Sequence, residues 1–195
     1  MAESLRKHLF VEDHYCSAEK ADELLQHCLK DLTLEEKPSL IVHGKQCHMN
    51  RSVGFFSDAV KNITYSHQSQ PSQPLTPLLS EFLEKVNKDF DQDFNSVLIN
   101  LYKDGNDYIG EHSDQESHLS KDGWVVGLSL GAERIFRVRH KTTKEKTDVT
   151  TKHGQLLVMG YGFQKTYSHS VPIQKKILGP RVSLTLRRHN VELNK

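Results

Sequence analysis

The sequence predicts a mainly β fold with flanking helices (α+β), whose core is a double-stranded β-helix, or jelly roll. The C-terminal two thirds contain short apolar runs separated by Gly-containing turns, as in antiparallel sandwiches and barrels. Two stretches with helical periodicity precede most of these runs. A length of 195 residues with 36% hydrophobic content suits one domain with its own core.

The first half of the chain contains the two predicted helices and a group of hairpins. Ser17 can cap a helix that continues to Leu29, and Pro77 precedes a second helix, Leu78–Val86, where a first-turn proline is tolerated. Between them, short apolar pieces broken by glycine and asparagine predict strands and hairpins exposed enough to form a lid. The stretch SQPSQPLTP is expected to be a turn-rich loop.

We expect a single domain, 1–195, made of consecutive parts. These are an N-terminal helical extension (about 1–38), lid hairpins (39–70), a helix (71–92) and the jelly-roll core (93–190). The strands expected in the core are the run from Asn95 toward Glu116, Trp124–Leu130, Ile135–Arg139, Thr147–Thr151, Gln155–Met159, Thr166–Pro172 and Arg181–Arg187.

Cysteine usage and hydropathy indicate the compartment. Cys16, Cys28 and Cys47 are an odd number without C-x-x-C spacing, which disfavours a disulfide framework and a cysteine zinc site. The N-terminus lacks the apolar stretch of a signal peptide, and no apolar run approaches the roughly 20 residues that span a bilayer. We therefore expect a soluble, intracellular protein of the nucleus or cytoplasm.

Charge is distributed unevenly along the chain. Residues 1–100 carry 10 Lys/Arg and 15 Asp/Glu, a net charge of −5, whereas residues 101–195 carry 16 and 10, a net charge of +6. The basic residues of the second half include Arg134, Arg137, Arg139, Lys141, Lys144 and Lys146. Such a run can follow the phosphates of a nucleic acid or simply form a solvated face, and the sequence leaves both interpretations open.

A histidine and an aspartate stand two residues apart at the end of the central run. Side chains two apart on an extended segment point to the same side, so His112 and Asp114 could bind one ion. Two histidines and one carboxylate with open positions are typical of non-haem Fe(II) oxygenases. With 12 histidines in the chain, a His-x-Asp pair also arises by chance in a solvated loop. His169, on a predicted strand, is a candidate third ligand.

The last predicted strand places two arginines inside the barrel. Arg181 and Arg187 are six residues apart, so they share a face with Ser183 and Thr185. An unpaired arginine there would be costly, so each requires either a fixed acidic partner or a bound diacid. A guanidinium binds a carboxylate through two hydrogen bonds, which suits a dicarboxylate that also chelates the metal.

These motifs together resemble the AlkB family of Fe(II)- and 2-oxoglutarate-dependent nucleic-acid dealkylases, from about Ser39 to Arg188. The resemblance is carried by Asn100-x-Tyr102, His112-x-Asp114, His169 and Pro180-Arg181-x-Ser183-x-Thr185-x-Arg187. It implies that His112, Asp114 and His169 bind Fe(II) and are catalytic, that Arg181 holds the distal carboxylate of 2-oxoglutarate, and that Asn100, Tyr102, Thr185 and Arg187 line the rest of the cosubstrate. Family members commonly have asparagine at Ser183, which puts one polar contact to the cosubstrate in doubt.

The resemblance also implies a reaction and a substrate. O₂ and 2-oxoglutarate would be consumed while an N-methyl group of 1-methyladenine or 3-methylcytosine, in DNA or RNA, is hydroxylated and lost as formaldehyde. The residues that it assigns to the substrate are His43, Gly44, Lys45, Arg51, Tyr65, Ser66, His67, Gln115 and Glu116. Tyr65 and His67 would contact the flipped nucleotide, and Glu116 could read an exocyclic amine. The alternative interpretation of Tyr65 and His67 is that they are ordinary strand residues of a solvent-facing sheet.

The expected partner is alkylated nucleic acid, bound by a monomer and without a membrane. We expect single strands to be preferred, because His43 stands where duplex-acting relatives carry an aromatic wedge. Two alternatives stay open. One is a hydroxylase or demethylase of the same chemistry that acts on protein or a small molecule, and the other is a non-catalytic jelly roll that binds nucleic acid.

Overall fold

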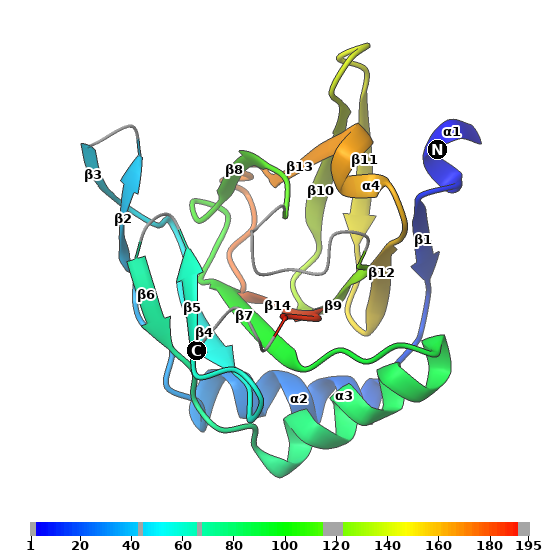
Figure 1. Cartoon of the computed structure of the whole chain (residues 1–195). Helices are drawn as coiled ribbons and strands as arrows, with labels where there is room; N and C mark the ends of the chain where they lie inside the picture. Colours follow the sequence, from blue (N-terminus) through cyan, green and yellow to red (C-terminus); the bar gives the residue numbers. More distant parts are fainter. Residues whose placement is uncertain (1–2, 43–44, 66–67, 115–122, 191–195) are drawn as a thin grey trace.

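The computed structural model describes residues 3–42, 45–65, 68–114 and 123–190, and it confirms the predicted jelly roll (Figure 1). Two antiparallel sheets form the core. In spatial order, the major sheet consists of β1 (Leu9–Glu12), β12 (Gln155–Met159), β9 (Val125–Gly131), β14 (Arg181–Arg187), β7 (Ser96–Tyr102) and β4 (Ser52–Phe56). The minor sheet consists of β11 (Lys146–Thr151), β10 (Arg134–His140), β13 (Tyr167–Val171) and β8 (Ile109–His112).

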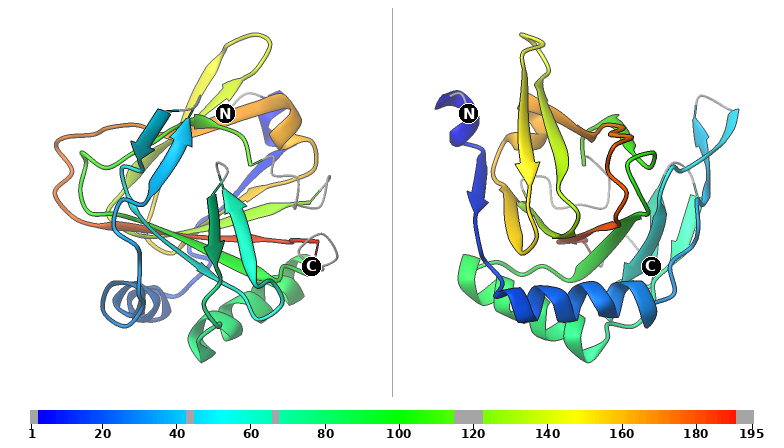
Figure 2. Two further views of the ribbon diagram at one scale, coloured as in Figure 1. Left: turned by 60° about the vertical axis from the view of Figure 1, so that its left-hand side comes forward. Right: turned by 180° about the vertical axis from the view of Figure 1, so that it is seen from behind.

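Two separate hairpins stand beside the core, where the lid was predicted (Figures 1 and 2). Strand β2 (Ser39–Val42) pairs with β3 (Lys45–His48), and β5 (Asn62–Tyr65) pairs with β6 (Gln68–Pro71). Figure 2 also shows the long β10–β11 hairpin projecting from the barrel on another side.

Helices α2 (Ala18–Lys30) and α3 (Pro77–Phe90) cover the outer face of the major sheet (Figure 2). Both begin as the sequence predicts: the Ser17 hydroxyl accepts a hydrogen bond from the Lys20 N–H, and Thr76 caps α3 directly before Pro77. Their apolar faces join the largest hydrophobic cluster, which includes Leu24, Cys28, Leu79, Phe82, Val86, Val126, Leu128, Leu156, Val182 and Leu184. This layer supports the floor of the site from outside.

Alternate side chains of β14 face opposite sides of the major sheet, one the hydrophobic core and the other the barrel interior. Val182, Leu184 and Leu186 pack in the cluster beneath the helices. The intervening residues Arg181, Ser183, Thr185 and Arg187 line a cavity on the other face. The inward direction predicted for the two arginines is therefore confirmed.

Some elements differ from the expectation. The segment 1–38 is not only helical, because it contributes the edge strand β1, which pairs with β12. Strand β4 comes from the segment assigned to the lid but pairs with β7 in the major sheet. Strand β6 begins within the predicted lid, 39–70, and overlaps the start of the stretch expected to be a loop. Strands of four or five residues at sheet edges carry too few alternations to be recognised by periodicity. The short helices α1 (Glu3–Arg6) and α4 (Phe163–Thr166) were missed for the same reason.

Within the described part of the chain, no helix has the length and apolar character needed to cross a membrane.

Candidate metal centre and cosubstrate pocket

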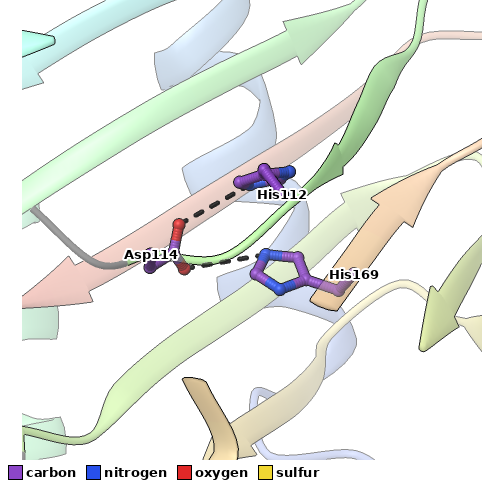
Figure 3. Close-up of side chains that lie close together, drawn as sticks. All are labelled: His112, Asp114 and His169. Carbon is purple, nitrogen blue, oxygen red and sulfur yellow. Dashed lines mark ion pairs between the residues drawn. The ribbon is translucent and has the colours of Figure 1, made fainter. Parts of the chain in front are cut away.

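Two neighbouring strands of the minor sheet, β8 and β13, bring the three predicted metal ligands together (Figure 3). His112 is the last residue of β8 and stands directly opposite His169 of β13 in the strand register. The Asp114 carboxylate faces both rings from one side, with 3.6 Å from each Nε2 to the nearer oxygen. One ligand atom from each residue falls within 4.8 Å of the others, a spacing that suits a single ion.

Hydrogen bonding and burial leave both imidazoles able to coordinate. His112 Nδ1 lies 2.8 Å from the Gly110 carbonyl oxygen, which can only accept, so Nδ1 carries a hydrogen and Nε2 is the nitrogen that faces the metal position. Burial lowers the pKa of His169 to about 3, although the Asp114 charge acts in the opposite direction. His169 is thus neutral at physiological pH, and its ring is stacked against Phe136, 5.1 Å between centroids.

The Asp114 carboxylate is held in its ionised form. Burial by itself would raise the pKa of this group, but Arg187, and then His169 and His112, hold the pKa well below its usual value. Arg187 Nη2 donates a 2.7 Å hydrogen bond to Asp114 Oδ1 inside the barrel. A fixed acidic partner therefore exists for one of the two inward arginines.

A cavity that is open to solvent adjoins the three ligands. Its floor follows the register of β9, β14 and β7, with Arg181 opposite Tyr102, Ser183 between Ser129 and Asn100, and Thr185 between Gly127 and Leu98. All six residues that the resemblance assigns to the cosubstrate line this cavity: Asn100, Tyr102, Arg181, Ser183, Thr185 and Arg187.

Arg181 and Arg187 are both buried on this floor. Arg187 is paired with Asp114, whereas Arg181 forms no ion pair with a carboxylate among the described residues. Its Nη2 donates to the Ser129 hydroxyl at 2.8 Å, and its guanidinium lies 5.3 Å from the centre of the Tyr102 ring. Its Nε is buried and has no hydrogen-bond partner among the described residues. A bound carboxylate would satisfy this donor, so the residues present fit a dicarboxylate cosubstrate.

Arg51 also lines the cavity, and it is the predicted substrate residue that the structure places closest to the cosubstrate residues. It precedes β4, is buried, and its Nε donates a 2.6 Å hydrogen bond to Asn100 Oδ1. The side-chain oxygen of Asn100 is thus engaged by the protein.

The other predicted substrate residues lie on the lid or just beyond the ligands. Lys45 begins β3 and is exposed, and Tyr65 is the last residue of β5. The remaining predicted positions, His43, Gly44, Ser66, His67, Gln115 and Glu116, lie outside the described residues.

The basic run of the second half is largely engaged within the protein. Arg134 is 1% exposed, so it belongs to no surface, and its guanidinium donates to the backbone carbonyls of Asp104, Asp107 and Pro172. The partners of four others are Asp148 for Arg137, Glu111 for Arg139, the Gln164 carbonyl for Lys141 and the Lys141 carbonyl for Lys144, and Lys146 is exposed. Buried Arg134 fits neither interpretation of the basic run, and for the other residues both interpretations stay open.

Two residues at the site were missed in the sequence. Ser129 holds Arg181, and the side chain of Gln164 accepts the backbone N–H of Asp114 at 2.9 Å. The position of Ser129 in the period-two pattern of its strand could have indicated an inward hydroxyl. Gln164 lies on a four-residue helix and carries no such pattern.

A jelly roll with two histidines and a carboxylate at one point, beside a buried arginine that forms no ion pair with a described carboxylate, defines a non-haem Fe(II) oxygenase of the 2-oxoacid-dependent class. The family model of the 2OG-Fe(II) oxygenase superfamily matches residues 8–187. Among curated proteins, human DNA oxidative demethylase ALKBH2 is 35% identical over 179 residues, 87% of this chain and 69% of the relative. The chain therefore belongs to the 2OG-Fe(II) oxygenase superfamily and, within it, to the AlkB family, which implies Fe(II), 2-oxoglutarate and O₂.

Other relatives and solved structures agree with this assignment. Human alpha-ketoglutarate-dependent dioxygenase alkB homolog 3 is 33% identical over 134 residues, 64% of this chain and 47% of the relative. The structure of OsALKBH1 has a TM-score of 0.65 at 14% identity and covers 93% of this chain and 97% of its own. The structure of a Pseudomonas putida prolyl-4-hydroxylase has a TM-score of 0.61 at 16% identity and covers 96% of this chain and 97% of its own. At such identities, these structures support the fold alone.

Proposed function

We propose that this chain removes methyl groups oxidatively from N-alkylated bases, of the 1-methyladenine and 3-methylcytosine type, in DNA or RNA. The main support is the convergence of His112, Asp114 and His169 beside Arg181 in one cavity. Similarity to proteins named DNA oxidative demethylase supports the substrate class. The chain spans about two thirds of the length of those relatives, 64% to 69%, and the proposal treats residues 1–195 as one oxygenase domain.

In this proposal, the three ligands bind Fe(II) through the two Nε2 atoms and the Asp114 carboxylate. Arg181 holds the distal carboxylate of 2-oxoglutarate, and Tyr102 and Thr185 line the rest of that molecule. Arg187 keeps Asp114 ionised and oriented through its 2.7 Å hydrogen bond. Asn100 acts through Arg51, which it fixes at the cavity wall.

Bound iron supplies the activation of O₂ that a protein side chain cannot provide. One oxygen atom ends in succinate when the bond between the carboxyl and keto carbons of 2-oxoglutarate breaks and CO₂ leaves. The other atom is inserted into a C–H bond of the N-methyl group. The resulting N-hydroxymethyl group loses formaldehyde, and the nitrogen regains its hydrogen or lone pair. The protein's contribution is to hold the ligands, orient both substrates and exclude bulk water from a mostly buried site.

The direct test uses oligonucleotides that carry one defined lesion, incubated with Fe(II), 2-oxoglutarate and ascorbate. We expect succinate and formaldehyde in equal amounts and a mass loss equal to one methylene. His112→Ala, Asp114→Ala and His169→Ala should each abolish all three. Succinate without formaldehyde from any oligonucleotide would instead indicate hydroxylation of a protein or small molecule, and absence of iron-dependent succinate would indicate a non-catalytic protein.

The proposal includes a preference for single strands. Extruding a base from a duplex costs a few kcal/mol, which an aromatic wedge can offset. His43, which by the resemblance stands where duplex-acting relatives carry that wedge, has a side chain that is smaller and more strongly hydrated than a phenyl ring. Lys45 is exposed and suited to phosphate contact. Repair of one 3-methylcytosine strand, alone and annealed, should favour the single strand. His43→Phe should increase repair of the duplex, and equal wild-type rates on both substrates would contradict the proposal.

We further propose a monomer in the nucleus or cytoplasm. The compartment is supported by the three cysteines, which are free thiols. Sedimentation of the purified protein tests the monomer, and fractionation of cells tests the compartment.

A further inference from the structure

Asp114 lies beyond the strand that carries His112. Strand β8 ends at His112, and its pairing with β13 includes no bond to residue 114. The extended direction that places both side chains on one ion is therefore not maintained by the sheet at Asp114. Some other group must hold the backbone there, since a shift of this residue would move the carboxylate away from the two imidazoles.

One residue earlier, the Ser113 hydroxyl donates to the Tyr167 carbonyl of β13 at 3.1 Å, and the Asp114 N–H itself is held by the side chain of Gln164. Its Oε1 accepts the Asp114 N–H at 2.9 Å, where a neighbouring strand would offer a carbonyl. The orientation of the amide follows from chemistry, because a backbone N–H can only donate and so must face the oxygen. The other end of the amide, Nε2, lies 3.5 Å from the sulfur of Met159, which lines the cavity.

Gln164 is itself fixed from the β10–β11 hairpin. Lys141, just after β10, donates from Nζ to the Gln164 carbonyl at 2.6 Å and from its backbone N–H to the Thr166 carbonyl at 2.9 Å. These bonds hold the end of α4 against the minor sheet. A continuous set of hydrogen bonds thus runs from Lys141 through α4 to Asp114.

We propose that Gln164 is a positioning residue for the metal site: it holds Asp114 in register with His112 and His169, and Lys141 anchors it. This inference rests on the proposed role of Asp114 as an iron ligand. It also assigns Lys141 a role inside the protein instead of contact with phosphates. Outer groups that orient a metal ligand change metal affinity by roughly 10- to 100-fold when removed.

The test measures Mn(II) binding to the full-length, metal-free protein, with free Mn(II) followed by electron paramagnetic resonance. Gln164→Met keeps the length and apolar contacts of the side chain but removes the acceptor, and we expect the Kd for Mn(II) to rise about 10-fold or more. Gln164→Glu keeps an acceptor for the Asp114 N–H. We therefore expect its Kd for Mn(II) to be about 10-fold or more lower than that of Gln164→Met. A role in packing alone predicts the reverse order, since methionine would be tolerated and a half-buried carboxylate would not.

Gln73→Met is the matched control, because that half-buried amide donates to the Thr33 carbonyl away from the cavity. It should leave Mn(II) binding unchanged. Equal Mn(II) affinity of the Gln164→Met variant and wild type, or equal weakening by both Gln164 substitutions, would overturn the inference. If Gln164→Met does not fold, Lys141→Met, which releases α4 without changing Gln164, must weaken Mn(II) binding for the inference to stand. Failure of the wild type to bind Mn(II) would instead contradict the proposed function.

Discussion

The buried pair of Arg187 and Asp114 should matter most when no metal is bound. Arg187→Met removes the charge that compensates the carboxylate, whose side chain is only 4% exposed, and leaves it buried beside the His112 and His169 rings. Breaking such a pair costs about 3–5 kcal/mol. For a domain of this size, each kcal/mol lowers Tm by roughly 2–4 °C, so we expect a loss of roughly 6–20 °C in the metal-free protein.

A bound divalent cation places new positive charge on the same carboxylate. Thermal unfolding should therefore show a smaller difference between wild type and Arg187→Met in saturating Mn(II) than in EDTA. The metal also stabilises both proteins by mass action, so the comparison is between proteins within each condition. This would separate lost charge compensation from lost packing, because packing is the same in both conditions.

Arg137→Met provides the control, since Arg137 forms the same type of pair with Asp148 at the surface, where the two side chains are 37% and 39% exposed. It should cost less than about 1 kcal/mol, with or without metal. The reasoning about Arg187 is refuted if its substitution costs no more than that of Arg137, or if Mn(II) leaves the difference from wild type unchanged.

Three further outcomes are expected. Arg181→Met should raise the 2-oxoglutarate concentration needed for half-maximal succinate production by tenfold or more, since a charge-assisted contact worth about 1.5–3 kcal/mol is lost; an unchanged requirement would place the anion elsewhere. Arg134→Met should destabilise the fold by about 3 kcal/mol or more in urea, because three backbone carbonyls lose their donor, and a change below 1 kcal/mol would contradict this role. A thiol reagent should label only the exposed Cys47 in the native protein, because Cys16 and Cys28 are buried and burial raises the pKa of Cys28 to about 12. All three cysteines should react in denaturant. Labelling of Cys28 in the native protein would show that the helix layer opens.

The parts of the site that the sequence predicted depend on local periodicity. Alternation along β14 determined which side of the sheet Arg181 and Arg187 face, and the spacing of His112 and Asp114 indicated a shared ion. Both patterns survive folding because a strand fixes side-chain direction regardless of what lies opposite. The substrate residues of the lid remain predictions, as their side chains lie mostly outside the described part of the structure.

The parts that could not be predicted depend on contacts between distant segments. Two inward arginines looked equivalent in sequence, but only the fold places Asp114 beside Arg187 and leaves Arg181 for a ligand. Arg134 belonged to a basic run that suggested a surface, yet backbone carbonyls from two loops satisfy it in the interior. A sequence shows the charge of such a residue and gives no sign of the acceptors that surround it.

The position of β14 has a consequence for how the protein is made. It follows every other described strand along the chain, yet it lies between β9 and β7 in the middle of the major sheet. During synthesis, one edge of β9 and one edge of β7 therefore stay unpaired until residue 187 has left the ribosome. Unpaired strand edges can pair with other chains. A chain that stops short of β14 would lose Arg181, Arg187 and the central strand of the major sheet together. Truncated products should then aggregate instead of accumulating as partly active enzyme.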